Sequence, residues 1–131
     1  MGGYSQRSLR QKLGIQPGMR LYFYNLPADV LHELGDLDDD TTIVSDEALA
    51  SYLHYFITTE SELRSIAERV EHLQKPHQIF WISWPKKSSS VPTEITEQDL
   101  RDHLLPTGLV DVKVVAMSDV YSGLKFVWRK E

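Results

Sequence analysis

The sequence contains no cysteine. A chain without thiols forms no disulfide, no thiolate metal site and no cysteine nucleophile, and small secreted domains usually depend on disulfides for stability. The sequence also has no apolar run of roughly 18 residues, the length that a membrane-spanning helix needs, and no apolar signal-peptide core near its start. These absences predict a cytoplasmic protein that does not enter a membrane.

An excess of basic charge is missing as well. The 131 residues include 14 lysines and arginines against 19 acidic residues, which gives a formal net charge of −5. Nucleic-acid binding rests on dense Lys and Arg contacts to phosphate, so we expect no nucleic-acid partner. Hydrophobic residues make up 41% of the chain, an ordinary value for a globular protein with one core. We predict a single domain over residues 14–131, preceded by a flexible arm or short helix in residues 1–13.

The sequence does contain regular strand and helix patterns. Residues 78–84 are almost wholly apolar and end at a proline, the pattern of a strand covered on both faces, as in parallel sheets. Thr59 with Glu62 forms a capping box ahead of a helical apolar stripe, and Thr96 with Asp99 can cap a second helix. Further strands are expected at residues 19–24, 42–44, 52–58, 109–117 and 124–129.

These patterns predict an α/β domain with a mostly parallel, Rossmann-like sheet of about six strands and an antiparallel C-terminal hairpin. We expect the strand order 2-1-3-4-6-5. Residues 45–51 are too few for a full helical crossover, so a simple hairpin between strands two and three would overturn this order. A short helix should follow strand one, with Asn25 or Asp29 as its cap and Gly35 at its end.

Four segments of the chain form a specific set of motifs. They are KLGI with PG at residues 12–18, WPKKSS with Val91 and Thr93, GLVDVKV at residues 108–114, and SGLKF at residues 122–126. Through this set the chain resembles a bacterial family of small domains of unknown function, although Ser90 replaces a glycine and Tyr121 a tryptophan. The resemblance implies a fold similar to a trimmed class I methyltransferase, including the terminal hairpin, and it implies no activity.

The apolar segment 78–84 is followed by two lysines and three serines. In open α/β sheets ligands bind beyond the carboxyl ends of the strands, where helix N-termini present N–H groups and positive dipole ends. Ammonium and hydroxyl groups suit a phosphate or carboxylate, while the alternative is a solvated surface loop. We predict that a small anionic ligand or a protein partner binds the following residues. They are Lys86, Lys87, Ser88, Ser89 and Ser90.

A glycine-rich turn after the first strand is missing. The turn reads Asn-Leu-Pro-Ala from Asn25 onward, and Pro27 removes a donor N–H. Asn25, Asp46 and Glu47 are weaker candidates for an adenosyl or dinucleotide site, because Asp46 or Glu47 could stand where a ribose-binding acid belongs. Without the glycine turn we expect no cofactor.

Acidic residues between the second helix and third strand match part of a calcium-binding pattern. Asp36, Asp38, Asp40 and Glu47 occupy positions one, three, five and twelve of an EF-hand loop. Thr41 stands at position six, where the sharp turn needs glycine. We therefore favour a solubilising acidic loop and predict no metal site.

The sequence contains no complete catalytic motif. Asp99 and His103 lie four residues apart on one helix face, but no nucleophile elbow accompanies them, so we interpret them as a surface pair. The other histidines lack metal-ligand spacing and are interpreted as surface or packed imidazoles. We expect a non-enzymatic binding or interaction module. The alternatives are a reduced methyltransferase-like enzyme or adenosyl-ligand binder, and a structural homodimer built on edge strands.

Overall fold

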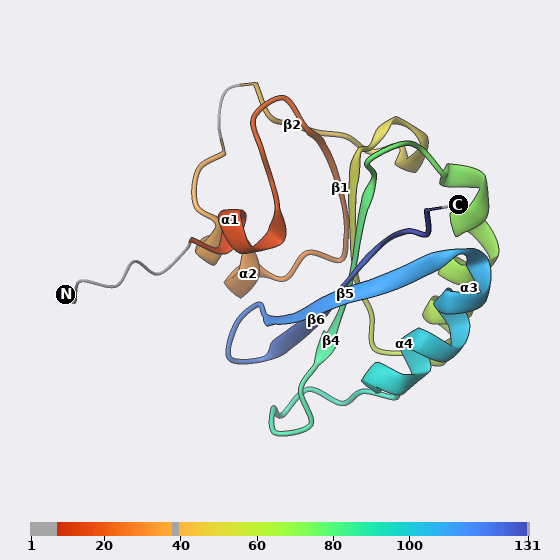
Figure 1. Cartoon of the computed structure of the whole chain (residues 1–131). Helices are drawn as coiled ribbons and strands as arrows, with labels where there is room; N and C mark the ends of the chain where they lie inside the picture. The colour runs from red at the N-terminus through yellow and green to blue at the C-terminus, as the bar shows by residue number, and fades with distance from the viewer. Residues whose placement is uncertain (1–7, 38–39, 131) are drawn as a thin grey trace.

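The computed structural model describes residues 8–37 and 40–130, which form a six-stranded sheet with helices on both faces (Figure 1). The sheet order is β2-β1-β3-β4-β6-β5, as predicted. β1 to β4 run parallel, β6 pairs antiparallel with β4, and β5 pairs antiparallel with β6 at the edge. The strands are β1 (Arg20–Tyr24), β2 (Thr42–Ile43), β3 (Tyr52–Phe56), β4 (Ile79–Pro85), β5 (Leu109–Ala116) and β6 (Tyr121–Trp128).

The link between β2 and β3 crosses β1 without an α-helix. It contains only a 3-10 turn, η1 (Glu47–Leu49), which the Asp46 carboxylate caps by accepting from the Ala48 N–H. Val44 and Ala50 of this link pack into the core on the face of α3. A short crossover is therefore enough to place β3 on the far side of β1, and no β2–β3 hairpin forms.

The helices divide between the two faces of the sheet (Figure 1). One face, here the α3 face, is covered by α3 (Glu60–Val70) and α4 (Glu97–Leu104), with 3-10 turns η2 (Glu71–Leu73) and η3 (Leu105–Thr107) after them. The opposite face, the α1 face, carries α1 (Leu9–Leu13) and α2 (Ala28–Leu34). Within the described residues, no helix is both long and apolar enough to cross a membrane.

β4 supplies both cores, because successive side chains of a strand point to opposite faces. Trp81 packs on the α1 face, where its Nε1–H donates to the Leu13 carbonyl at 2.9 Å. Phe80 and Ile82 pack on the α3 face. All of these side chains are buried, including Leu13 of α1. The alternation read from the sequence thus fixes which residues face which helices.

The predicted helix caps are partly confirmed. Thr59 and Thr96 form the expected capping boxes at the starts of α3 and α4. The predicted caps of α2 are wrong: its N-cap is Pro27, whose extended backbone makes no side-chain cap bond. Asn25 instead adopts a left-handed conformation (φ 56°) in the turn, and the Asp29 carboxylate accepts from the N–H of the next residue. Asparagine is one of the few residues that tolerate this conformation, so it serves the turn rather than the cap.

Candidate functional site

The predicted anion loop lies at the carboxyl end of β4 and has an ordered backbone. The Lys86 N–H donates to the Val120 carbonyl at 2.7 Å, and the Ser89 N–H and hydroxyl both donate to the Lys86 carbonyl. The Ser89 hydroxyl is therefore used within the loop. The side chains of Lys87, Ser88 and Ser90 are exposed, and these are the groups that remain available to a ligand.

Lys86 differs from the rest of the loop because it lines a hollow of 620 Å³ between α2 and the β5–β6 turn. The walls of this hollow also carry the carboxylates of Asp29, Glu33 and Asp119, with the imidazole of His32. An anion that entered the hollow would meet three carboxylates as well as one ammonium group. The predicted anion-binding side chains of Lys87, Ser88 and Ser90 are exposed and do not line this hollow.

The N-terminus of α3, which lies beyond the carboxyl end of β3, is already bonded to carboxylates of the chain. Glu62 Oε1 accepts from the N–H groups of Thr58 and Thr59 at 3.1 and 3.2 Å, and Glu94 Oε1 accepts from the Glu60 N–H at 2.9 Å. Burial acts to raise the pKa of Glu62, but the hydrogen bonds from Thr58, Tyr24 and Thr59 outweigh it and lower that pKa. The positive end of this helix is thus compensated internally.

α4 begins with a similar capping box. Asp99 Oδ2 accepts from the N–H and the hydroxyl of Thr96 at 2.9 and 3.0 Å. His103 Nδ1 lies 2.9 Å from the Asp99 carbonyl oxygen, so the predicted pair meets through the backbone and not through the carboxylate. Because both long helices beyond this edge have N–H groups bonded to carboxylates of the chain, they offer little to the phosphate or carboxylate of a ligand.

A small pocket of 200 Å³ opens between the ends of β1 and β3 and helix α3. Most of its polar groups are bonded to each other or to Glu47 beside it. The Tyr24 hydroxyl donates to Glu62 Oε2 at 2.8 Å, and Glu47 Oε2 accepts from the Tyr55 hydroxyl at 2.5 Å and from Arg69 Nη2 at 2.9 Å. Burial and then the bond to Glu47 raise the pKa of Tyr55. The pocket is smaller than the roughly 300–1,000 Å³ of typical ligand sites.

Two of the three weaker cofactor candidates are used in structural contacts. Glu47 is held by Arg69 and Tyr55, and Asp46 caps η1. Asn25 is exposed and shapes the turn after β1. A ribose hydroxyl would have to compete with Arg69 for the Glu47 carboxylate, because that ion pair is bidentate.

The possible calcium loop is interrupted by the sheet. β2 takes up Thr42 and Ile43, and Glu47 bonds to protein groups instead of facing the acidic loop. Asp38 lies outside the described residues. Over the part of the chain that the structure describes, no three His, Asp or Glu side chains are placed to hold a metal ion.

The α1 face contains a buried chain of hydrogen-bonded polar side chains that the sequence did not predict. The Tyr52 hydroxyl lies 2.9 Å from His54 Nδ1, and His54 Nε2 lies 2.7 Å from Ser83 Oγ. His54 also stacks on Phe56 with ring centroids 4.2 Å apart. The strand alternation places Tyr52, His54 and Phe56 on one face, but only the pairing of β3 with β4 brings Ser83 to the imidazole.

This chain of side chains has no access to solvent. His54 and Ser83 are each 0% exposed, and burial lowers the pKa of His54 to about 3. A neutral imidazole beside a serine hydroxyl is a familiar arrangement for nucleophilic catalysis, yet no substrate could reach it here. We assign it to the packing of the core.

Comparisons with known proteins bear on the fold. No protein-family model matches the sequence, and no curated protein sequence matches it at a significant level. A SAM-dependent methyltransferase from Aquifex aeolicus is similar in structure, with a TM-score of 0.59 at 13% identity over 88% of this chain and 85% of that chain. Aeropyrum pernix fibrillarin, solved with natively bound S-adenosyl-L-methionine, gives 0.56 at 9% identity over 91% and 73%.

A Streptococcus agalactiae protein of the NADB-Rossmann superfamily gives a TM-score of 0.53 at 12% identity, over 100% of this chain and 72% of that chain. Identities this low support a shared fold and no more. The chain therefore has a small, Rossmann-like α/β fold similar to that of SAM-dependent methyltransferases.

Proposed function

We propose that this chain is a non-enzymatic binding or interaction module on a methyltransferase-like fold. Its binding element is the loop after β4, which recognises an anionic group on a small ligand or on a protein partner. The exposed Lys87, Ser88 and Ser90 support this assignment, because they lie beyond the carboxyl end of a central strand and can donate to an anion.

The observation that carries the non-enzymatic part is the bonding of the helix N-termini by the chain's own carboxylates. Glu62 and Glu94 occupy N–H groups at the start of α3, and Asp99 occupies the start of α4. These bonds leave fewer donors for an anion beyond the strands, while a dinucleotide or adenosyl site of the Rossmann type needs free N–H groups at the helix after β1, here α2, together with a glycine turn. In α2 the Val30 N–H is bonded to the Asp29 carboxylate, and the turn before it begins with Asn25 and contains Pro27 instead of glycines.

We also propose membership of the bacterial family of small domains of unknown function. The WPKKSS and SGLKF segments support this membership, and each has a defined place in the fold. The first segment joins the end of β4 to the anion loop. The second places Gly123 of β6 opposite Ser83 of β4.

The anion loop is tested by the double substitution Lys86→Ala with Lys87→Ala. We expect phosphate or polyphosphate to raise the melting temperature of the parent protein and to have no effect on the double variant. The rise should shrink with added salt, because exposed charges are screened over ~10 Å at ordinary ionic strength. Lys12→Ala with Arg20→Ala, at two exposed basic residues outside the anion loop, is the control for lost charge.

Two results would contradict the small-anion form of this proposal. One is a phosphate-induced rise that survives the substitution of both lysines. The other is the absence of any rise in the parent protein with every anion tried. Loss of a protein partner on substitution, with folding intact, would instead identify the loop as an interaction surface.

A reduced methyltransferase-like enzyme or adenosyl-ligand binder is the second candidate. It is favoured by the similarity of the fold to structures of SAM-dependent methyltransferases. Mass spectrometry of the purified, denatured protein is a simple test of it. An adenosyl compound released in stoichiometric amount would favour this candidate over the binding module.

A structural homodimer is the third candidate, favoured by the long edge strand β5. Val112 and Val114 are 52% and 48% exposed on it. A register shift between Asp111 and Lys113 interrupts the edge, and such irregularities usually discourage strand pairing between molecules. Sedimentation equilibrium at micromolar concentration separates a stable dimer from a monomer.

A further inference from the structure

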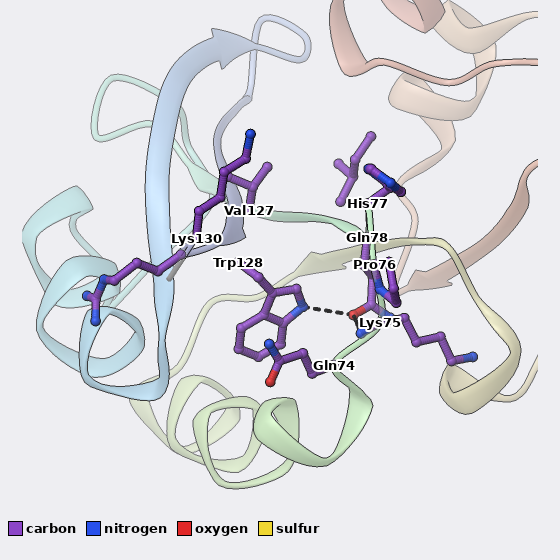
Figure 2. A pocket seen from close by; sticks show the side chains of 10 residues that line it. Gln74, Lys75, Pro76, His77, Gln78, Val127, Trp128 and Lys130 are labelled. Carbon is purple, nitrogen blue, oxygen red and sulfur yellow. Dashed lines mark hydrogen bonds between the residues drawn. The ribbon is translucent and has the colours of Figure 1, made fainter.

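A second concave site lies where β4 begins, at the opposite end of this strand from the anion loop (Figure 2). It is a pocket of 590 Å³ between the segment that leads into β4, residues 74–79, and the end of β6, residues 127–130. We call it the amino-edge pocket, because it lies where β4 begins. Its volume falls within the roughly 300–1,000 Å³ of small-molecule sites, unlike the pocket beside Tyr55.

The charge of the amino-edge pocket is opposite to that of the whole chain. Lys75, Arg129 and Lys130 contribute cationic groups and His77 contributes an imidazole, while none of its ten lining residues is acidic. The chain as a whole has a net charge of −5. Lys75 bonds through its ammonium group to the Ala48 carbonyl, which fixes its position and leaves its charge in place. An anion is therefore the favoured ligand here.

The floor of the pocket is an indole held in one orientation. Trp128 Nε1–H donates to Gln78 Oε1 at 3.0 Å, and Phe80 meets the indole edge to face at a centroid distance of 5.7 Å. Gln78 is itself buried, accepting from the Lys75 N–H and donating to the Ala50 carbonyl. Figure 2 shows the Trp128 indole extending from the segment that carries Lys130 toward Gln78, with the hydrogen bond between them dashed. A fixed aromatic side chain can pack against a flat ring without losing further conformational freedom.

We propose that the amino-edge pocket binds a small aromatic anion, in which a flat ring packs against Trp128 and a phosphate or carboxylate meets the basic groups on the rim. A nucleoside monophosphate and an aromatic carboxylic acid share this chemistry. The proposal is independent of the anion loop, which lies at the other end of β4.

The test follows the three tryptophan indole N–H signals by NMR while separate samples receive adenosine monophosphate, anthranilate, adenosine or inorganic phosphate. We expect one of the first two to shift the Trp128 signal saturably and to leave those of Trp81 and Trp84 in place. Adenosine and phosphate should bind about tenfold more weakly or less, because each lacks one half of the ligand. Trp128→Phe assigns the signal. The comparison of the first two ligands separates a nucleotide from an aromatic acid.

Variants of exposed residues keep the test independent of folding. Arg129→Glu with Lys130→Glu should weaken binding on the order of tenfold, since two rim charges are reversed. His77 has a left-handed backbone (φ 61°) that glycine adopts freely, so His77→Gly removes the imidazole without straining the loop. Should Trp128→Phe not fold, the signal that His77→Gly perturbs identifies Trp128.

The matched control is Lys86→Glu with Lys87→Glu, which changes the net charge equally at the other edge. It should leave binding in the amino-edge pocket unchanged apart from a small loss common to any added negative charge. Two results overturn the proposal: no saturable shift of the Trp128 signal with either aromatic anion at several millimolar, or binding that the control weakens as much as the rim variant does.

Discussion

At the scale of single residues, the buried His54 makes the free energy of unfolding depend on pH. Its pKa is about 3 in the folded protein because burial disfavours the charged imidazole, whereas an unfolded histidine titrates near 6.5. Above pH 6.5 both states are neutral and the residue has no effect. Below that value the unfolded chain takes up a proton that the folded chain excludes, so the free energy of unfolding falls as the pH drops.

We therefore expect the free energy of unfolding to fall by about 2 kcal/mol between pH 6.5 and pH 5 from this residue, measured by urea denaturation. This window lies above the range in which carboxylates titrate. His54→Gln keeps hydrogen-bonding groups but cannot titrate, so it should be less stable at pH 7 and show a flatter profile. A parent protein whose stability stays constant from pH 7 to pH 5 would disprove the argument.

Gly123 is a second residue whose role depends on close packing. A Cβ atom built there would lie 2.3 Å from Met117 Cε, 2.7 Å from Ser83 Oγ and 3.3 Å from a ring carbon of Trp81. The methionine end can move, but Ser83 is tied to His54.

Gly123→Ala should therefore lower the free energy of unfolding by about 1–3 kcal/mol through overpacking. Ser90→Ala, at an exposed site, should stay within about 0.5 kcal/mol of the parent. Equal stability of the two variants in chemical denaturation would show that the β4–β6 contact relaxes easily.

At the scale of elements, the N-terminus of α3 is held by two kinds of hydrogen bond. The sequence predicts the local ones but not those to distant residues. The capping box of Thr59 and Glu62 follows from local spacing. The bond from the Tyr24 hydroxyl to Glu62 and the bond from the Glu60 N–H to Glu94 join residues 38 and 34 positions apart. No local pattern contains such contacts, because they depend on the approach of β1 and of the loop before α4.

Glu62→Ala should lower the free energy of unfolding by about 1–2 kcal/mol, because it removes the acceptor for the N–H groups of Thr58 and Thr59 and for the Tyr24 hydroxyl. Glu68→Ala, exposed on the same helix, is the control and should have little effect. If urea denaturation gives the two variants the same stability, the carboxylate does not hold this helix terminus.

The strand order could be predicted from the sequence because the alternation of apolar runs and helix signals restricts the topology, although the short link before Tyr52 is compatible with a hairpin as well. The cap of α2 was mispredicted, since Asn25 serves a left-handed turn and Pro27 takes the cap position. The His54–Ser83 contact and the amino-edge pocket could not be predicted, because each joins strands or segments that meet only in the folded sheet.

At the scale of the whole molecule, the two edges of the sheet differ in what they offer a ligand. Beyond the carboxyl ends of the strands, Glu62, Glu94 and Asp99 occupy the helix N-termini, and Glu47 is paired with Arg69. The fold is similar to that of SAM-dependent methyltransferases, but the turn after β1 contains Pro27 in place of glycines, and the Val30 N–H of α2 already bonds to the Asp29 carboxylate. We therefore propose that no adenosyl cofactor binds beyond the carboxyl ends of these strands.

Isothermal titration calorimetry with S-adenosylmethionine at millimolar concentration measures whether the cofactor binds there. We predict no saturable heat, or a Kd in the millimolar range or weaker, because the cofactor would have to displace bonds that the chain makes to itself. A Kd in the micromolar range at the carboxyl edge would contradict the account and establish the methyltransferase-like alternative.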